Sequence, residues 1–275
     1  MKYLLLLLFA LLLGGCGGED AQSGDQNSPL LSTQTTWYWQ LYVDENHPLR
    51  RDIPAKLYDI DLFDTPTEVI EELKNEGKIV ICYFSAGSYE PWRPDSHLFP
   101  PEALGEPLEG WEEERWLDIR NPDVRAVMAL RLDLARQKGC DGVEPDNVDG
   151  YTNETGFALT YDDQLEYNRF LAREARSRGL LVGLKNDLLQ VADLVSDFDF
   201  ALNEQCHRFD ECSYLEPFVL QNKPVFNAEY WSGYVTDDAA FAKLCEEAER
   251  ENFRTLVLPE NLDGSFVKSC DYGEY

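Results

Sequence analysis

The chain has 275 residues, of which 52 are acidic and 24 are basic, and its formal net charge is −28. This charge excludes most nucleic-acid binders, which need a basic surface to replace the counterions of the phosphates. Hydrophobic residues make up 44 % of the chain and aromatic residues 12 %, enough for a large buried core. The chain has three histidines, His47, His97 and His207. A metal site built from several imidazoles is therefore excluded, and we look for function among the carboxylates.

The N-terminus has the features of an export signal. Lys2 precedes an apolar run over residues 3–13, which is too short to span a bilayer. The Leu-Gly-Gly-Cys sequence that ends at Cys16 resembles a bacterial lipobox, and an ordinary cleaved signal is the alternative. Residues 16–35 are small, polar and without periodicity, as in a flexible tether. We therefore expect a signal peptide over residues 1–15 and lipidation of Cys16, with the exported protein anchored at the outer membrane, the cell surface or the periplasmic side.

Six cysteines remain after Cys16. An even number of cysteines in an oxidising compartment favours disulfides. Proximity along the chain suggests three pairs: Cys206 with Cys212, Cys245 with Cys270, and Cys82 with Cys140. The alternative is a zinc site built from Cys206, His207 and Cys212, which neither the spacing nor the compartment supports.

From residue 36 onward, short apolar runs alternate with amphipathic stretches, which is typical of repeated βα units. Strands are predicted over residues 36–42, 57–63, 78–86, 141–147, 180–186, 199–206, 224–230 and 255–260. Helices are predicted over residues 121–138, 161–178 and 237–252, and between Pro66 and Gly77. This alternation predicts an α/β fold with a single (β/α)8 TIM barrel over residues 36–275. An open doubly wound sheet is the alternative, but no Gly-x-Gly-x-x-Gly turn follows the first strand.

Polar residues stand at the ends of seven predicted strands, where a barrel of this kind places its active site. They are Asp59 and Asp61; Tyr83, Ser85 and Gly87; Glu144, Asp146 and Asn147; Lys185 and Asn186; Asn203 and Glu204; Glu229 and Tyr230; and Glu260 and Asn261. Any one of them could be a helix cap or a solvated loop residue. Their common register indicates a site.

Two acidic positions have the chemistry of a glycosidase. Side chains alternate along a strand, so Glu144 and Asp146 share a face. The fourth and sixth strands contribute to the same interior layer of a barrel, which lets Asp146 and Glu204 face each other. Two carboxyl groups that flank a bond are what glycoside hydrolysis requires, whereas acids that only cap helices and solvate the rim are the alternative. A calcium loop around Gly150 fails, because Gly156 stands where the bidentate glutamate belongs.

Aromatic residues near the strand ends could stack on sugars, although many of them are expected in the core. They are Trp37, Trp39, Tyr83, Tyr89, Trp92, Tyr151, Tyr230 and Trp231.

Six segments carry a more specific resemblance. They are Cys-Tyr-Phe-Ser-Ala-Gly-Ser-Tyr-Glu-Pro-Trp-Arg-Pro-Asp (82–95), Trp-Leu-Asp-Ile-Arg (116–120), Gly-Cys-Asp-Gly-Val-Glu-Pro-Asp-Asn-Val-Asp-Gly-Tyr (139–151), Gly-Leu-Lys-Asn (183–186), Asn-Glu-Gln-Cys (203–206) and Glu-Tyr (229–230). Together they resemble glycoside hydrolase family 114, whose members are (β/α)8 endo-α-1,4-polygalactosaminidases. The resemblance extends over about residues 36 to 270, with the motifs in family order.

The resemblance implies that Asp146 is the nucleophile and Glu204 the acid/base, with no metal or organic cofactor. It also implies a sugar site that contains Asp61, Tyr83, Ser85, Asn147, Lys185, Glu229 and Tyr230. Residues 96–114 are expected to vary with the substrate.

The implied substrate gives the negative charge a purpose. Galactosamine units without acetyl groups carry ammonium groups, and an acidic protein attracts such a polymer, although acidity that only maintains solubility is the alternative. We therefore expect a lipid-anchored monomer that cleaves internal α-1,4-galactosaminidic bonds. A non-catalytic carbohydrate-binding lipoprotein and a hydrolase of another amino-sugar polysaccharide remain as alternatives, and both a retaining and an inverting mechanism stay open.

Overall fold

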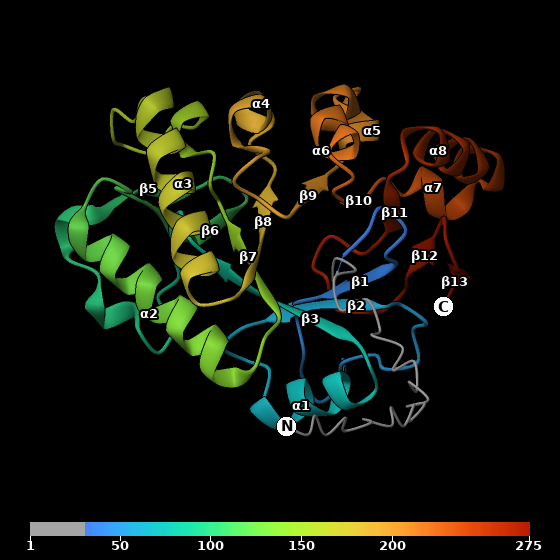
Figure 1. Cartoon of the computed structure of the whole chain (residues 1–275), viewed down its shortest axis with the longest axis horizontal. Helices are drawn as coiled ribbons and strands as arrows, with labels where there is room; N and C mark the ends of the chain where they lie inside the picture. Colours follow the sequence, from blue (N-terminus) through green and yellow to red (C-terminus); the bar gives the residue numbers. More distant parts are fainter. Residues whose placement is uncertain (1–30) are drawn as a thin grey trace, which may run out of the picture. The chain divides into compact units, whose positions relative to one another are not determined.

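Eight parallel strands follow one another around a single curled sheet in the computed structural model, which describes residues 31–275 (Figure 1). They are β1 (Trp37–Gln40), β2 (Leu57–Asp61), β3 (Ile79–Ser85), β7 (Gly142–Asp146), β8 (Leu181–Lys185), β9 (Phe200–Glu204), β10 (Val225–Glu229) and β11 (Arg254–Val257). Each strand pairs in parallel with the next. All of them overlap the strands that the sequence predicts.

The edge between β1 and β11 departs from the closed barrel that we expected. Within residues 31–275, no ladder of backbone hydrogen bonds joins these two strands. The outer edge of β11 pairs instead with β12 (Lys268–Ser269), which continues antiparallel into β13 (Gly273–Glu274). Side chains connect β1 to this edge, since the Trp37 indole donates a hydrogen bond to the Arg254 carbonyl at 2.7 Å. The protein therefore has an α/β fold with a curled, mostly parallel ten-stranded sheet.

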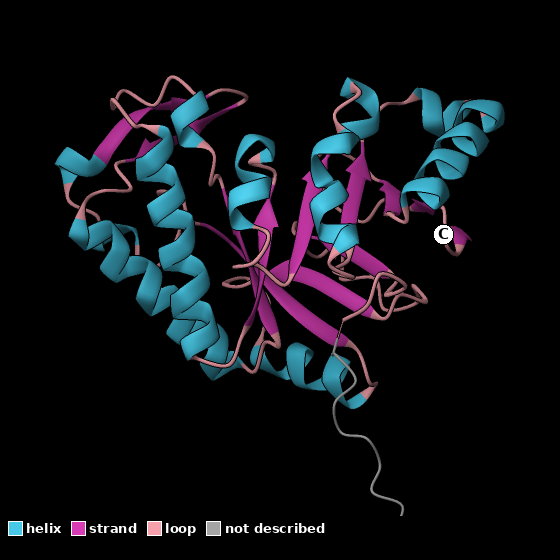
Figure 2. Ribbon diagram, turned by 45° about the horizontal axis from the view of Figure 1, so that its top comes forward, coloured by secondary structure: helices cyan, strands magenta, loops and turns pink. Residues whose placement is uncertain are grey.

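Helices lie on the outside of the curled sheet (Figure 2). They are α1 (Thr67–Asn75), α2 (Pro122–Lys138), α3 (Tyr161–Ser177), α4 (Val191–Leu194), α5 (Cys206–Phe209), α6 (Glu216–Leu220), α7 (Gly233–Thr236) and α8 (Asp238–Glu251). Short 3₁₀ helices lie at Ser96–Leu98, Pro101–Ala103, Gly150–Thr152, Leu188–Gln190 and Cys212–Leu215. The helices α1, α2, α3 and α8 are those that the sequence predicts. In α2, for example, the Asn121 side chain caps the first turn and Gly139 ends the helix at φ 89°.

A small antiparallel sheet between β3 and α2 was not predicted. It contains β4 (Ser88–Tyr89), β5 (Leu104–Leu108) and β6 (Trp111–Leu117), in the order β4, β6, β5. Gly110 forms the turn between β5 and β6 at φ 82°, a conformation that favours glycine. The strand β5 and the first half of β6 lie within residues 96–114, which we expected to vary with the substrate, whereas β4 precedes them.

Aromatic side chains fill the interior of the curled sheet below its carboxyl edge. Trp37 is buried and stacks on Trp39, whose side chain lies on the same face of β1, with ring centroids 5.9 Å apart. Phe226 contacts Trp37 on its other side, and Phe200 packs against Phe226. A Cβ atom at Gly183 would lie 2.2 Å from the Phe200 ring, so glycine is required there. These aromatic residues support the strand ends from below.

Residues 31–275 form one unit, and the predicted signal peptide, Cys16 and residues 16–30 lie outside the described part of the chain. The last five residues of the predicted tether pack on this unit, since Leu31 and Thr35 are buried. Among the described residues, no helix has the length and apolar character needed to cross a membrane.

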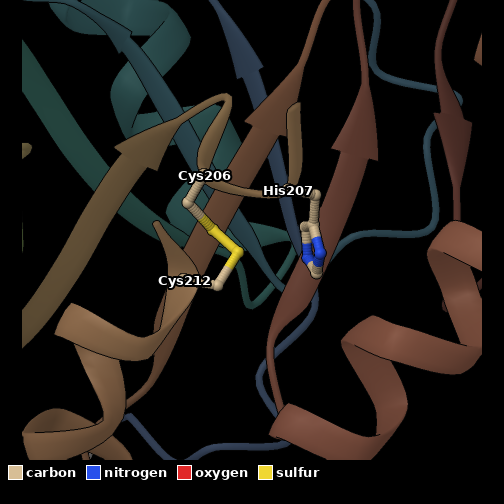
Figure 3. A group of neighbouring side chains, drawn as sticks. All are labelled: Cys206, His207 and Cys212. Atoms are coloured by element: carbon tan, nitrogen blue, oxygen red, sulfur yellow. A yellow bond between two sulfur atoms is a disulfide. The ribbon is translucent and has the colours of Figure 1, made fainter. Parts of the chain in front are cut away.

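Three disulfides link the pairs that proximity along the chain suggested. They are Cys82–Cys140, Cys206–Cys212 and Cys245–Cys270. Figure 3 shows the bond between Cys206 and Cys212 beside His207. Zinc needs cysteine thiolates, and these two sulfur atoms are bonded to each other, so the zinc alternative is wrong.

Candidate active site

A cavity of about 670 Å³ opens at the carboxyl ends of the parallel strands. The predicted catalytic and sugar-site residues Asp61, Tyr83, Asp146, Asn147, Lys185 and Glu204 line it, together with the strand-end residues Asn186, Glu260 and Asn261. The first six come from β2, β3, β7, β8 and β9 and from the residue that follows β7. The cavity therefore lies where the register of polar strand ends predicts a site.

Lys185 is the centre of the polar cluster in this cavity. Its Nζ atom lies 2.9 Å from an Asp146 oxygen, 3.2 Å from a Glu204 oxygen and 3.3 Å from a Glu144 oxygen. The Trp39 ring lies below the ammonium group, with its centroid 4.9 Å from Nζ. Burial alone would lower the pKa of Lys185, but the surrounding carboxylates hold it well above its usual value. Lys185 is therefore a fixed cation that holds the two predicted catalytic acids together.

The side chains of both acids are partly exposed in the cavity. The side chain of Asp146 is 18 % exposed and that of Glu204 is 28 % exposed, whereas Lys185 is 3 % exposed. The Tyr230 hydroxyl donates to one Glu204 oxygen, and the Asn186 amide donates to the other at 3.2 Å. Neighbouring donors thus fix the orientation of Glu204 while its carboxylate still meets the cavity.

The backbone turns sharply after each strand that carries a member of this cluster. Asn147, Asn186 and Gln205 directly follow Asp146, Lys185 and Glu204, and their φ angles are 59°, 48° and 62°. Asparagine tolerates this left-handed conformation better than most residues, whereas glutamine is strained in it. Asn186 also uses its side chain, because its carbonyl oxygen accepts a hydrogen bond from the Glu204 backbone amide at 2.9 Å. These turns end the strands at the positions where the functional side chains are needed.

Three predicted sugar-site residues lie behind the cavity wall. Ser85 is buried, and its hydroxyl accepts a hydrogen bond from the Asn147 amide at 2.9 Å. Glu229 is also buried, and one of its oxygens accepts from the His207 backbone amide at 3.0 Å, at the start of α5. Tyr230 acts through its bond to Glu204. These residues support the site from behind.

Asp61 and Tyr83 differ in whether their polar groups already have hydrogen-bond partners in the protein. Both Asp61 oxygens accept hydrogen bonds from the Arg93 guanidinium, at 2.6 and 3.1 Å, so this carboxylate is already occupied. The Tyr83 hydroxyl lines the cavity, and no hydrogen bond joins it to another of the described residues. Burial raises the pKa of Tyr83 well above its ordinary value. Tyr83 is therefore a neutral donor with a hydroxyl group that is available to a ligand.

The inserted sheet and its flanking loops contribute an acidic and aromatic wall to the cavity, of which only Trp92 was among the predicted sugar-stacking residues. This wall consists of Glu90, Trp92, Leu108, Glu109, Trp111, Glu113, Glu114 and Trp116. Trp92 is 51 % exposed and Trp111 is 56 % exposed, so both indole rings are accessible to a ligand in the cavity. The glycine at position 110, which is typical of a turn, was the available sequence signal.

The chain is similar to one enzyme family and to structures from it. Residues 18–274 match the model of Glycoside-hydrolase family GH114. The crystal structure of Aspergillus fumigatus Ega3 in complex with galactosamine covers 90 % of this chain and 100 % of that one, at 37 % identity and a TM-score of 0.80. The glycoside hydrolase domain of PelA from Pseudomonas aeruginosa shares the fold: the match covers 84 % of this chain and 97 % of that one, at 15 % identity and a TM-score of 0.66. A stretch of 96 residues is 34 % identical to the uncharacterized protein MJ1477 of Methanocaldococcus jannaschii, and it spans 33 % of this chain and 28 % of that protein.

Proposed function

The chain belongs to glycoside-hydrolase family GH114 and is a glycosidase, and on this premise we propose that it cleaves internal α-1,4-galactosaminidic bonds in a galactosamine-rich polysaccharide. The observation that carries the proposal is the pair of carboxylates, Asp146 and Glu204, which one buried lysine holds at the edge of the cavity. Two carboxyl groups on either side of a glycosidic bond supply both the proton and the nucleophile of the reaction.

We assign Asp146 as the nucleophile and Glu204 as the acid/base. In the first step, an Asp146 oxygen bonds to the anomeric carbon while Glu204 gives its proton to the departing glycosidic oxygen. In the second step, Glu204 takes a proton from water, the water oxygen bonds to the same carbon, and the bond to Asp146 breaks. Asp146 has the shorter contact with the Lys185 ammonium, at 2.9 Å, whereas Glu204 lies 3.2 Å from it and also accepts a hydrogen bond from the Tyr230 hydroxyl.

The shared lysine also supports a retaining mechanism. Two oxygens that lie 2.9 and 3.2 Å from one nitrogen are at most about 6 Å apart. Retaining glycosidases separate their carboxyl groups by roughly 5 to 5.5 Å, whereas inverting enzymes need roughly 6.5 to 9.5 Å to admit a water molecule. The site therefore fits direct attack by Asp146 better than attack by an activated water.

The acidic wall supports an amino-sugar polymer as the substrate. Glu109, Glu113 and Glu114 line the cavity beside the exposed rings of Trp92 and Trp111. Ammonium groups of deacetylated galactosamine would meet these carboxylates, and sugar faces would stack on the indoles. The similarity to Ega3, whose structure contains galactosamine, points to the same class of sugar.

The mature protein is proposed to act as a lipid-anchored monomer outside the cytoplasm, held through Cys16. Its eight parallel strands are proposed to work as a (β/α)8 barrel whose β1 and β11 are joined through side chains, a view supported by the bond from Trp37 to the Arg254 carbonyl. Incorporation of labelled palmitate tests the anchor. We expect labelling of the full chain and none of Cys16→Ala.

The activity is tested with purified protein on deacetylated and acetylated galactosamine polymers. We expect new reducing ends and a ladder of short oligomers from the deacetylated polymer, identified by product mass. Binding without turnover would identify the carbohydrate-binding alternative, and cleavage of a different amino-sugar polymer would identify the other. Asp146→Asn is the matched inactive control.

A further inference from the structure

Two further carboxyl groups, those of Asp59 and Glu144, lie behind the catalytic pair within hydrogen-bonding reach of each other. Asp59 in β2 is 1 % exposed and Glu144 in β7 is 0 % exposed. None of their four carboxyl oxygens forms a hydrogen bond of normal geometry with the described residues. Buried carboxylates without donors are strongly unfavourable, so the two groups need a proton between them.

A shared proton resolves this arrangement. When one of the two carboxyl groups is protonated, its O–H can donate to the other, and the pair then carries a single negative charge. Burial raises the pKa of Asp59 and that of Glu144 above their ordinary values, and the proximity of Asp59 raises that of Glu144 further. Both directions fit a pair that keeps one proton at neutral pH.

The surroundings connect this pair to the catalytic site through Lys185. The charged and titratable groups that face the pair are Tyr83 of β3, Asp146 of β7, Lys185 of β8 and Tyr230 after β10, and Glu204 of β9 lies on the far side of Lys185. Of these described groups, Lys185 is the cation, and its Nζ atom lies 3.3 Å from a Glu144 oxygen. The same nitrogen contacts Asp146 and Glu204. A change of charge on the pair therefore acts directly on the cation that holds both catalytic acids.

We propose that Asp59 and Glu144 form a proton-sharing pair that positions Lys185 and, through its single negative charge, keeps the proton on Glu204. The proposal rests on the proposed function, because it requires Asp146 and Glu204 to be the catalytic acids. One negative charge on the pair offsets part of the charge of Lys185. Without it, the ammonium would favour the deprotonated form of Glu204, which cannot act as an acid. Asp59 and Glu144 are thus positioning residues that act through Lys185.

Amide substitutions separate the charge of the pair from its shape. Asp59→Asn and Glu144→Gln each replace the shared proton with an amide hydrogen and leave one carboxylate, so the negative charge remains. The double variant Asp59→Asn/Glu144→Gln removes the charge. The basic limb of the pH profile is the fall of kcat/KM at high pH, where Glu204 loses the proton that it must donate. We expect this limb to move to lower pH by about one unit in the double variant. Each single variant should shift the limb by less than half as much.

The matched control is Glu251→Gln, another carboxyl group with an unpartnered buried oxygen, in α8. It should leave the pH profile unchanged. A folded and active double variant whose basic limb stays in place or moves to higher pH would overturn the proposal. Single variants that shift the limb as far as the double variant would also overturn it, because the pair would then not share its charge.

Infrared difference spectra give a second readout that needs no activity. At neutral pH, the spectrum of the full chain minus that of either single variant should show the band of one protonated carboxyl group, and Glu251→Gln serves as the reference for ordinary substitutions. Absence of this band would overturn the shared proton even if the double variant does not fold. A chain that shows the band and has no hydrolytic activity would instead contradict the proposed function.

Discussion

Arg93 and Lys185 each lie among carboxylates at the same cavity, but they leave those carboxylates in different states. Arg93 contacts Asp61 at 2.6 Å and Glu90 at 2.8 Å, and the side chains of these two acids are only 4 % and 2 % exposed. Lys185 contacts Asp146 and Glu204, which are 18 % and 28 % exposed. In the first cluster Arg93 already binds the carboxylates and connects the loop between β4 and β5 to β2, whereas in the second cluster the carboxylates remain more exposed to the cavity. Exposure separates the carboxylates available for chemistry from those that hold the fold together.

The largest expected effect concerns the open cluster. Asp146→Asn and Glu204→Gln should each lower kcat on the polymer by roughly 10³-fold, because each removes one of the two groups that act on the bond. The free energy of unfolding, measured in urea, should change little. Asp197→Asn is a control, since this aspartate is 39 % exposed and pairs with Arg169 at the surface. Wild-type turnover by either catalytic variant would falsify the assignment.

The closed cluster should respond in stability. Arg93→Met leaves Asp61 buried without its cation and Glu90 with only the more distant Arg131, at 3.7 Å, and we expect it to lower the free energy of unfolding by about 3 to 5 kcal/mol. Arg169→Met removes a cation of an exposed pair and should cost about 0 to 1 kcal/mol. Urea titrations measure the free energy of unfolding of both variants, and the two losses can then be compared. Equal losses for both would mean that burial does not distinguish these ion pairs.

Another buried acid gives a pH-dependent prediction. Burial raises the pKa of Asp187 to about 8. Between its unfolded value near 4 and this folded value, the native state holds a proton that the unfolded chain has released, so stability falls as pH rises. Asp187→Asn should remove part of this loss, on the order of 2 kcal/mol between pH 5 and pH 8. Urea titrations at pH 5 and pH 8 give this change in the free energy of unfolding for the wild type and the variant. The same change in both proteins would contradict the raised pKa of Asp187.

The smallest effects are expected at the acidic wall. Glu109→Gln and Glu113→Gln should each raise KM for deacetylated polymer by roughly two- to fivefold, and added salt should reduce the difference from the wild type. Glu71→Gln, an exposed acid on α1, should leave KM unchanged. Hydrolysis rates that do not fall with salt would count against attraction of a cationic polymer.

The parallel strands and the proximity of the candidate catalytic residues could be predicted because regular physical patterns encode them. Apolar runs with polar ends predicted β7 and β9, and the resulting register brought Asp146 and Glu204 together. Lys185 ends β8 between them, which the resemblance also implied. The position of its ammonium group among three carboxylates could not be predicted, since it depends on side-chain distances between different strands.

The inserted sheet and the closing edge could not be predicted in the same way. The strands β5 and β6 contain exposed glutamates in place of an apolar run, so periodicity gave no signal for them. The pairing of β12 with β11 involves two residue pairs far from β1 in the sequence. Ser85 and Glu229 were predicted as sugar contacts, but their burial became visible only once the neighbouring loops were placed.

In the proposed mechanism, Asp146 is the nucleophile and Glu204 is the acid/base. This assignment is tested most directly by incubating Glu204→Gln with a galactosaminyl fluoride, whose leaving group needs no acid, and mapping the labelled peptides by mass spectrometry. The account predicts a covalent sugar on Asp146, which accumulates because the base for the second step is missing. A label on another residue, or an unlabelled enzyme that releases product with inverted configuration, would contradict it.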